Sequence, residues 1–134
     1  MKTSPIISDQ LAWSLLRRAL ALLLMAHGVA RIYLGTVDDF GGFLNIKGFP
    51  LGVVIAWSIT IFEILGGALL FFNYFTRWIA LVFALELLMG IILVHAQNGW
   101  FVVGASLGGV EYSVLLIICF SLIALRHHDS DVKN

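Results

Sequence analysis

Four long apolar stretches constrain the fold of this chain more than any other feature. They cover roughly residues 11–34, 51–72, 77–96 and 107–125. A helix needs about 20 mostly apolar residues to cross about 30 Å of hydrocarbon, because each residue adds about 1.5 Å. The stretches are continuously apolar, whereas strands of a membrane barrel are shorter and alternate apolar with polar residues. The sequence therefore predicts an all-α integral membrane protein, a four-helix bundle.

The composition supports a place in the membrane. Of the 134 residues, 60% are hydrophobic and only 12% are charged. Soluble domains are about half apolar and about a quarter charged. A chain of this length cannot bury so much apolar surface internally, so we expect the surplus to face lipid. We expect one domain over residues 1–134, a multi-pass protein of the cell membrane whose first partner is the lipid bilayer.

The charges and the cysteine content exclude some classes of function. Eight basic and eight acidic residues give a formal net charge of zero, and the basic residues are scattered along the chain. The basic patch of a nucleic-acid-binding protein is absent from this pattern, so we expect no nucleic-acid partner. Cys119 is the only cysteine, which excludes an intrachain disulfide and a relay between two thiols of this chain.

Basic residues beside the spans predict the orientation, because Lys and Arg in short loops favour the cytoplasmic side. A bundle with its N-terminus inside leaves only Arg31 and Lys47 outside. The basic residues on its cytoplasmic side are then Lys2, Arg17, Arg18, Arg77, Arg126 and Lys133. We therefore expect the arrangement N-in/C-in.

The connections add detail to this bundle. Residues 73–76 form a link so short that the second and third spans must be antiparallel neighbours. The first connection is longer, and we expect a short helix over about 38–46 that places Phe40, Phe43 and Leu44 on one side and lies in the membrane interface. The Gly66-Gly67 pair is expected to let neighbouring helices approach closely.

Ionisable side chains within the spans are the candidate functional residues, because each costs several kcal/mol in hydrocarbon unless it is paired or hydrated. The candidate binding cluster consists of His27, Arg31, Glu63, His95 and Glu111. In one interpretation the cluster opens to the outside, Arg31 holds an anionic group, and the His and Glu side chains move protons. In the other interpretation, the charges only hold the helices together. The sequence leaves both open, and it assigns no catalytic residue.

Glu86 and the metal question are treated separately. Nine residues of helical rotation place Glu86 opposite His95, so we expect it to pair with Arg17 or Arg18. None of these side chains has the His-x-x-x-His or Glu-x-x-His spacing that builds a metal site on one helix, so we predict no metal site.

Several short motifs follow one another along the chain in a distinctive order and spacing. Arg18 leads a first span that ends in His27-Gly28-Val29-Ala30-Arg31, and Gly48-Phe49-Pro50 precedes the second. The remaining motifs are Glu63-Ile64-Leu65-Gly66-Gly67, Phe75-Thr76-Arg77 and Gly108-Gly109-Val110-Glu111-Tyr112. In order and spacing these motifs resemble the DoxX family of small four-helix membrane proteins, and the resemblance extends from Arg17 to Leu125. It implies a protein of the cytoplasmic membrane of a bacterium or archaeon.

The resemblance also implies a function: members of this family look like subunits of quinone-linked thiosulfate oxidoreductases or of oxidative-stress complexes. This chain departs from the redox members, since it lacks a cysteine pair and has Arg31 where the family usually has Lys. We therefore expect the membrane subunit of a quinone- or thiosulfate-linked oxidoreductase system, with quinone as the candidate cofactor and another subunit as its partner. The alternative is a non-enzymatic small-solute carrier or assembly factor. A homo-oligomer is compatible with either.

Overall fold

The fold is all-helical throughout the part of the chain that the computed structural model describes, residues 6–104 and 108–131. The elements, in order, are α1 (Asp9–Tyr33), α2 (Val37–Ile46), α3 (Gly52–Phe71), α4 (Thr76–Leu93), the 3-10 helix η1 (His95–Asn98) and α5 (Glu111–Asp131). The expected all-α class is thus confirmed, with no strand in these two ranges. The expected short helix near 38–46 is present as α2.

The helix ends follow local chemistry. At the start of α1, the Ser8 hydroxyl accepts a hydrogen bond from the Leu11 amide at 3.2 Å, which caps the helix. α4 ends three residues before the expected position 96, because Val94 leaves the helical conformation with φ −124° and ψ −60°. His95 therefore lies in η1, not on α4. α5 begins at Glu111, and the expected start at residue 107 lies outside the described residues.

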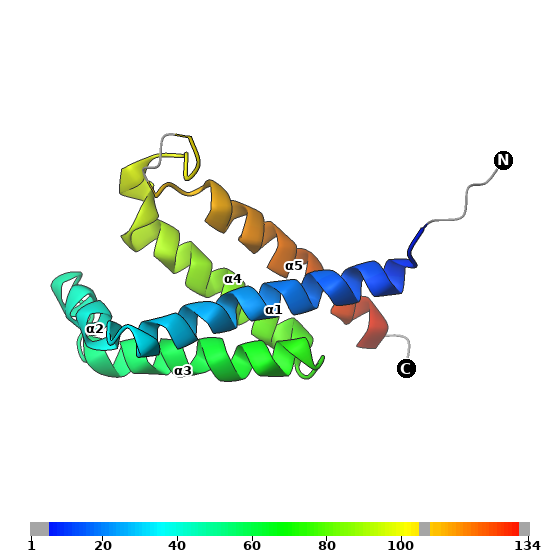
Figure 1. Cartoon of the computed structure of the whole chain (residues 1–134), viewed down its shortest axis with the longest axis horizontal. Helices are drawn as coiled ribbons and strands as arrows, with labels where there is room; N and C mark the ends of the chain where they lie inside the picture. The colour runs from blue at the N-terminus through cyan, green and yellow to red at the C-terminus, as the bar shows by residue number, and fades with distance from the viewer. Residues whose placement is uncertain (1–5, 105–107, 132–134) are drawn as a thin grey trace.

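The helices form two antiparallel pairs that cross each other (Figure 1). α1 packs along α3, and α4 packs along α5, while contacts between the two pairs are fewer. The pairs meet near the beginning of α1 and the end of α5, and they diverge toward the end that carries α2 (Figure 1). This divergence leaves room between α1, α2, α3 and α4.

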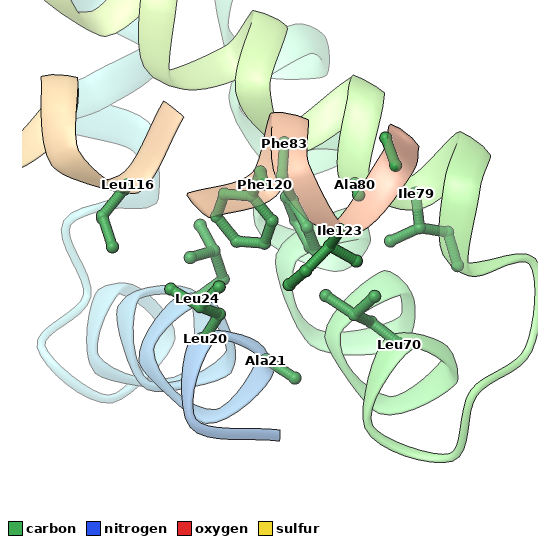
Figure 2. Packing of buried hydrophobic residues seen from close by; sticks show 11 residues of the cluster. Leu20, Ala21, Leu24, Leu70, Ile79, Ala80, Phe83, Leu116, Phe120 and Ile123 are labelled. Atoms are coloured by element: carbon green, nitrogen blue, oxygen red, sulfur yellow. The ribbon is translucent and has the colours of Figure 1, made fainter. Parts of the chain in front are cut away.

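The apolar core fills the end where the pairs cross. Figure 2 shows side chains from α1, α3, α4 and α5 converging there. Phe83 of α4 and Phe120 of α5 are fully buried, with ring centroids 5.4 Å apart. The core fixes the crossing point of the two pairs, so the opposite end is the part of the bundle that is open.

Small residues allow α1 and α3 to approach closely. A Cβ atom at Gly28 would meet the Thr60 carbonyl oxygen at 2.9 Å, and one at Gly67 would meet the Met25 side chain of α1. The expected role of Gly67 in close helix packing is confirmed. Small residues have this role in many membrane bundles. The contact at Gly28 matters more for function, because it brings the last turns of α1 against the middle of α3.

The outer surface is suited to lipid. Among the described residues, α3 and α4 are each long and apolar enough to cross a membrane, and α1 with α2 passes the same test as a pair bent by 97°. Large apolar side chains such as Val54, Leu65 and Leu85 are about 60% exposed. Soluble monomers rarely expose so much contiguous apolar surface. The fold is therefore that of a membrane protein.

Arg17 is buried in the crossing region, and within the described part of the chain it has no carboxylate partner. Its Nη1 donates hydrogen bonds to the carbonyl oxygens of Leu70 and, at 2.6 Å, of Phe71, which belong to the last turn of α3. A basic side chain at a helix C-terminus donates hydrogen bonds to carbonyl groups that have no partner within the helix. Its positive charge is also attracted to the negative end of the helix dipole. The expected pairing of Glu86 with Arg17 is wrong, because Arg17 caps α3 instead.

Replacing Arg17 with Ala should destabilise the protein by about 1–3 kcal/mol, because the carbonyl groups at the end of α3 lose a charged donor. Thermal unfolding in detergent, followed by circular dichroism, measures this loss. The control is Arg18→Ala, since Arg18 is exposed and lies over the Phe71 ring at 5.5 Å. Equal losses in the two variants would contradict the capping role.

Candidate functional site

A cavity of about 520 Å³ lies where the two helix pairs diverge. Apolar side chains from α1 to α4 form most of its wall, including Phe40 and Phe43 of α2 and Leu85 and Leu93 of α4. Its polar lining consists of His27, Arg31, Ser58, Glu63, Glu86, His95 and Ser113. Four of the five residues predicted from the sequence, all except Glu111, therefore line one cavity.

An ion pair between α1 and α3 is the strongest polar contact in this cavity. Arg31 Nη1 lies 2.7 Å from Glu63 Oε2, and Nη2 donates to Glu63 Oε1 at 3.3 Å. The Glu63 side chain is 4% exposed and that of Arg31 is 19% exposed. Two-point contact fixes the orientation of both groups. A buried pair of this kind costs about 3–5 kcal/mol when one partner is removed, because the other charge is left uncompensated.

Neighbouring residues hold Arg31 in this position. The Thr60 hydroxyl accepts a hydrogen bond from Arg31 Nη1 at 2.9 Å and donates one to the Ala56 carbonyl at 2.8 Å. The Phe40 ring lies under the guanidinium group, with 4.8 Å between Cζ and the ring centroid. A cation–π contact of this kind is worth about 2 kcal/mol when it is shielded from water. α2 therefore folds back over the ion pair and covers it.

Glu86 of α4 faces the same pair from the other side of the cavity. Its side chain lines the same cavity as Glu63 and Arg31 and lies close to both. Two carboxyl groups and one guanidinium group thus share one partly apolar space. The expectation that Glu86 lies away from the candidate cluster is wrong.

The error at Glu86 has a physical cause. The rotation of nine residues that separates it from His95 applies only to a continuous helix. Because α4 ends at Leu93 and η1 follows, the chain turns and His95 returns to the cavity that Glu86 also lines. Val82, Gly90 and Leu93 lie near Glu86 on the same face of α4 and line the cavity as well. The helical spacing of positions 82, 86, 90 and 93 was the sequence signal that Glu86 shares a face with these residues.

The two histidines approach the cavity from different elements. His27 belongs to α1, one turn before Arg31, and is exposed. His95 Nδ1 lies 2.7 Å from the Gly108 carbonyl oxygen. Because a carbonyl only accepts hydrogen bonds, Nδ1 carries the hydrogen atom, and in the neutral ring Nε2 is an acceptor. His95 is thus oriented by the connection before α5.

Glu111 does not join Arg31. Its Oε1 accepts hydrogen bonds from the backbone amides of Val102, at 2.7 Å, and Val103, at 3.0 Å. Its own amide donates to the Trp100 carbonyl at 3.0 Å. The expectation that Glu111 belongs to the polar cluster is therefore wrong in geometry. Its role is to fold the connection between η1 and α5, the same connection that orients His95.

Sequence reasoning missed Thr60 and Phe40 as parts of the site. Thr60 lies three residues before Glu63, so both side chains share one face of α3, and this spacing was a usable signal. Phe40 was placed on the apolar side of a short helix, but its contact with Arg31 depends on how α2 folds back.

Among residues 6–104 and 108–131, no three His, Cys, Asp or Glu side chains gather as metal ligands would.

Taken together, these features define a helical membrane protein with a largely apolar cavity and an ion pair at its wall. The family model described as DoxX matches residues 12–96, which include α2 to α4, all but the first three residues of α1, and most of the cavity lining. The chain therefore belongs to the DoxX family. No solved structure matches it.

A curated relative supports the same assignment. A protein of Bacillus subtilis (strain 168), named "Putative oxidoreductase CatD", is 29% identical over 120 residues. The alignment covers 88% of this chain and 81% of that protein. The similarity therefore extends over most of both chains.

Replacing Glu111 with Ala should release the connection before α5, because the amides of Val102 and Val103 lose a charged acceptor. Hydrogen–deuterium exchange measures this effect, and we expect exchange at these two amides to accelerate about tenfold or more. The control is Gln97→Ala, which removes only a contact from η1 to the Leu93 carbonyl at the end of α4, just before the connection. Unchanged exchange in the Glu111 variant would show that other contacts hold the connection.

Proposed function

We propose that this protein is the membrane subunit of an oxidoreductase system and binds a quinone-type molecule in the cavity between α1, α2, α3 and α4. The observation that carries the proposal is the cavity itself, whose apolar wall surrounds a few convergent polar groups. Small-molecule sites have this composition, and volumes of about 300–1,000 Å³ are typical of them. The relative named as an oxidoreductase favours the same class of function.

The residues present suit a quinone. The phenylalanine rings of α2 and the leucines of α4 offer apolar contact to a ring and to the beginning of an isoprenoid tail. Carbonyl oxygens of a quinone accept hydrogen bonds, and His27 and Arg31 carry donors on one side of the cavity. A bound quinone supplies the ability to accept and release electrons and protons. The other residues of the chain provide binding and orientation.

The polar residues of the chain then have distinct tasks. Glu63 and Thr60 orient Arg31, so that the guanidinium group stays at the cavity wall. Glu86 and the two histidines are the groups that exchange protons near the ligand, since they line the cavity and can act as general acids or bases. Phe40 excludes water from the ion pair. Electrons come from a partner subunit in this proposal.

The alternative function is a non-enzymatic carrier or assembly factor in which the charges are structural. One observation favours it: both terminal nitrogens of Arg31 already donate to Thr60 or Glu63. The two functions differ in one respect that is measurable. A structural pair makes no demand on the volume of the cavity, whereas a binding site does.

We also propose that α1, α3, α4 and α5 each cross the cytoplasmic membrane, as a four-helix bundle with both ends inside. The lengths and apolar composition of α3 and α4 support a crossing by each of these two helices. Arg17 and Arg126 lie at the end of the molecule that holds the beginning of α1 and the end of α5. Because basic residues favour the cytoplasmic side, this end is the cytoplasmic one in the proposal. The cavity then opens in the outer half of the membrane.

Replacing Gly90 with Leu tests the binding site without removing a charge. Gly90 lines the cavity, and a Cβ atom there meets no other atom within 4 Å, so the larger side chain enters open space. We expect a short-chain ubiquinone or menaquinone analogue to raise the unfolding temperature of the wild-type protein in detergent. In Gly90→Leu, the same shift should require at least a tenfold higher concentration of the analogue.

The stability of the ligand-free variant should be unchanged or higher, because Leu favours a helix over Gly by about 0.8–1 kcal/mol. The matched control is Gly42→Leu on α2, where a Cβ atom also meets nothing within 4 Å but faces away from the cavity lining. This control should keep the quinone-dependent shift. Absence of any shift in the wild type would sink the quinone assignment and favour the structural alternative.

The orientation has its own experiment. Two reporters are fused separately after the last residue. A fluorescent protein that folds only in the cytoplasm should be active there, and an alkaline phosphatase that is active only outside the cytoplasm should be inactive. Phosphatase activity in that fusion would place the C-terminus outside. It would also reverse the side on which the cavity opens.

A further inference from the structure

A second, smaller cavity lies at the opposite end of the molecule from the candidate site. It measures about 370 Å³ and is bounded by the beginning of α1, the turn between α3 and α4, and the end of α5. In Figure 1 these three segments come together at one end of the bundle. It shares no residue with the first cavity. Neither the proposed quinone site nor the family match assigns it a role.

The lining of this end cavity is rich in hydrogen-bond donors and basic. Its polar residues are Gln10, Ser14, Arg17, Asn73 and Arg126, and the described residues that line it include no carboxylate. Two guanidinium groups therefore face one small space without an acidic partner there. Such a site attracts an anion, and planar guanidinium groups suit phosphate oxygens best.

Each arginine keeps donors for a ligand. Arg17 uses Nη1 for the carbonyl groups at the end of α3, and a guanidinium group has five N–H donors in all. Arg126 is exposed, and its Cζ lies over the Trp13 ring at 4.8 Å from the centroid. The ring holds Arg126 at the mouth of the cavity. The Asn73 oxygen accepts from Thr76 at 3.1 Å, which leaves its amide hydrogens as donors.

The surroundings of the cavity indicate the kind of anion. Leu122 of α5 lies one turn before Arg126 on the same side of the helix and is about half exposed, at 46%. Trp13 also lines the cavity, and tryptophan is typical of the membrane–water interface. A ligand with a phosphate group at the interface and apolar chains along Leu122 and Trp13 satisfies both halves of the surface. Basic pockets between membrane helices recognise lipid head groups in this way.

We propose that the end cavity binds the phosphodiester group of an anionic phospholipid, with Arg17 and Arg126 as its two cationic contacts. This inference rests on the proposed crossing of the membrane by these helices, but not on the quinone site. The bound lipid links the beginning of α1, the turn before α4 and the end of α5. It thereby holds the end of the bundle on which the crossing of the two pairs depends.

The experiment uses the full-length protein, freed of lipid in detergent and titrated with phosphatidylglycerol or with phosphatidylcholine. Native mass spectrometry measures how many lipid molecules the protein retains. We expect the wild type to retain phosphatidylglycerol at lower concentrations than phosphatidylcholine. Arg126→Gln should weaken phosphatidylglycerol binding about fivefold, which is the effect of about 1 kcal/mol for one basic residue near an anionic surface.

Two further variants separate the cavity from general surface charge. Ser14→Phe fills the cavity and keeps both arginines, so it should weaken phosphatidylglycerol binding as well. Arg77→Gln removes a charge near the same turn, but Arg77 lies over Trp78 and outside the cavity lining, so this control should bind like the wild type. Circular dichroism verifies that each variant keeps its helices.

Three results would overturn the proposal. The first is equal retention of the two lipids by the wild type. The second is a loss in Arg77→Gln as large as that in Arg126→Gln. The third is displacement of phosphatidylglycerol by millimolar inorganic phosphate, which would assign the cavity to a soluble anion instead of a lipid. A failure of quinone binding with intact phosphatidylglycerol binding would affect only the function proposed for the other cavity.

Discussion

The ion pair between Arg31 and Glu63 is the contact on which the open end of this bundle depends. Two charges in an apolar seam are tolerable only when they meet with good geometry, and this requires α1 and α3 to touch. Gly28 makes that approach possible, since any side chain there would strike the Thr60 carbonyl oxygen. α2 then folds back, and its Phe40 ring covers the guanidinium group. The wall of the cavity follows from these contacts.

The two ends of the molecule solve the problem of buried charge in different ways. At the crossing end, Arg17 is neutralised in part by the carbonyl groups that end α3, which needs only a helix terminus. At the diverging end, Arg31 meets a carboxylate, and a second carboxyl group from Glu86 comes close. The first arrangement uses backbone carbonyl groups as its acceptors. The second contains titratable groups beside a cavity, which is the usual setting of a functional site.

Membership of the DoxX family and the proposed site fit together at the level of parts. The family match over residues 12–96 includes both partners of the ion pair and Glu86, while Glu111 and α5 lie beyond it. Glu111 serves the fold of the connection that orients His95. The core of the site thus belongs to the matched region, and the last helix completes the bundle around it by packing along α4.

The sequence by itself determined the helices and the class of protein, because the length of an apolar run and the residues of a tight turn are local properties. It also identified Arg31 and Glu63, since a charge in an apolar span is visible without a fold. Only the tertiary structure decided which charges meet. Glu86 joins Glu63 and not Arg17, because the relative rotation of packed helices is set by contacts such as Gly28 against Thr60, which no single helix encodes. His95 reaches the cavity because α4 ends at Leu93, and a small change in where a helix ends redirects every later side chain.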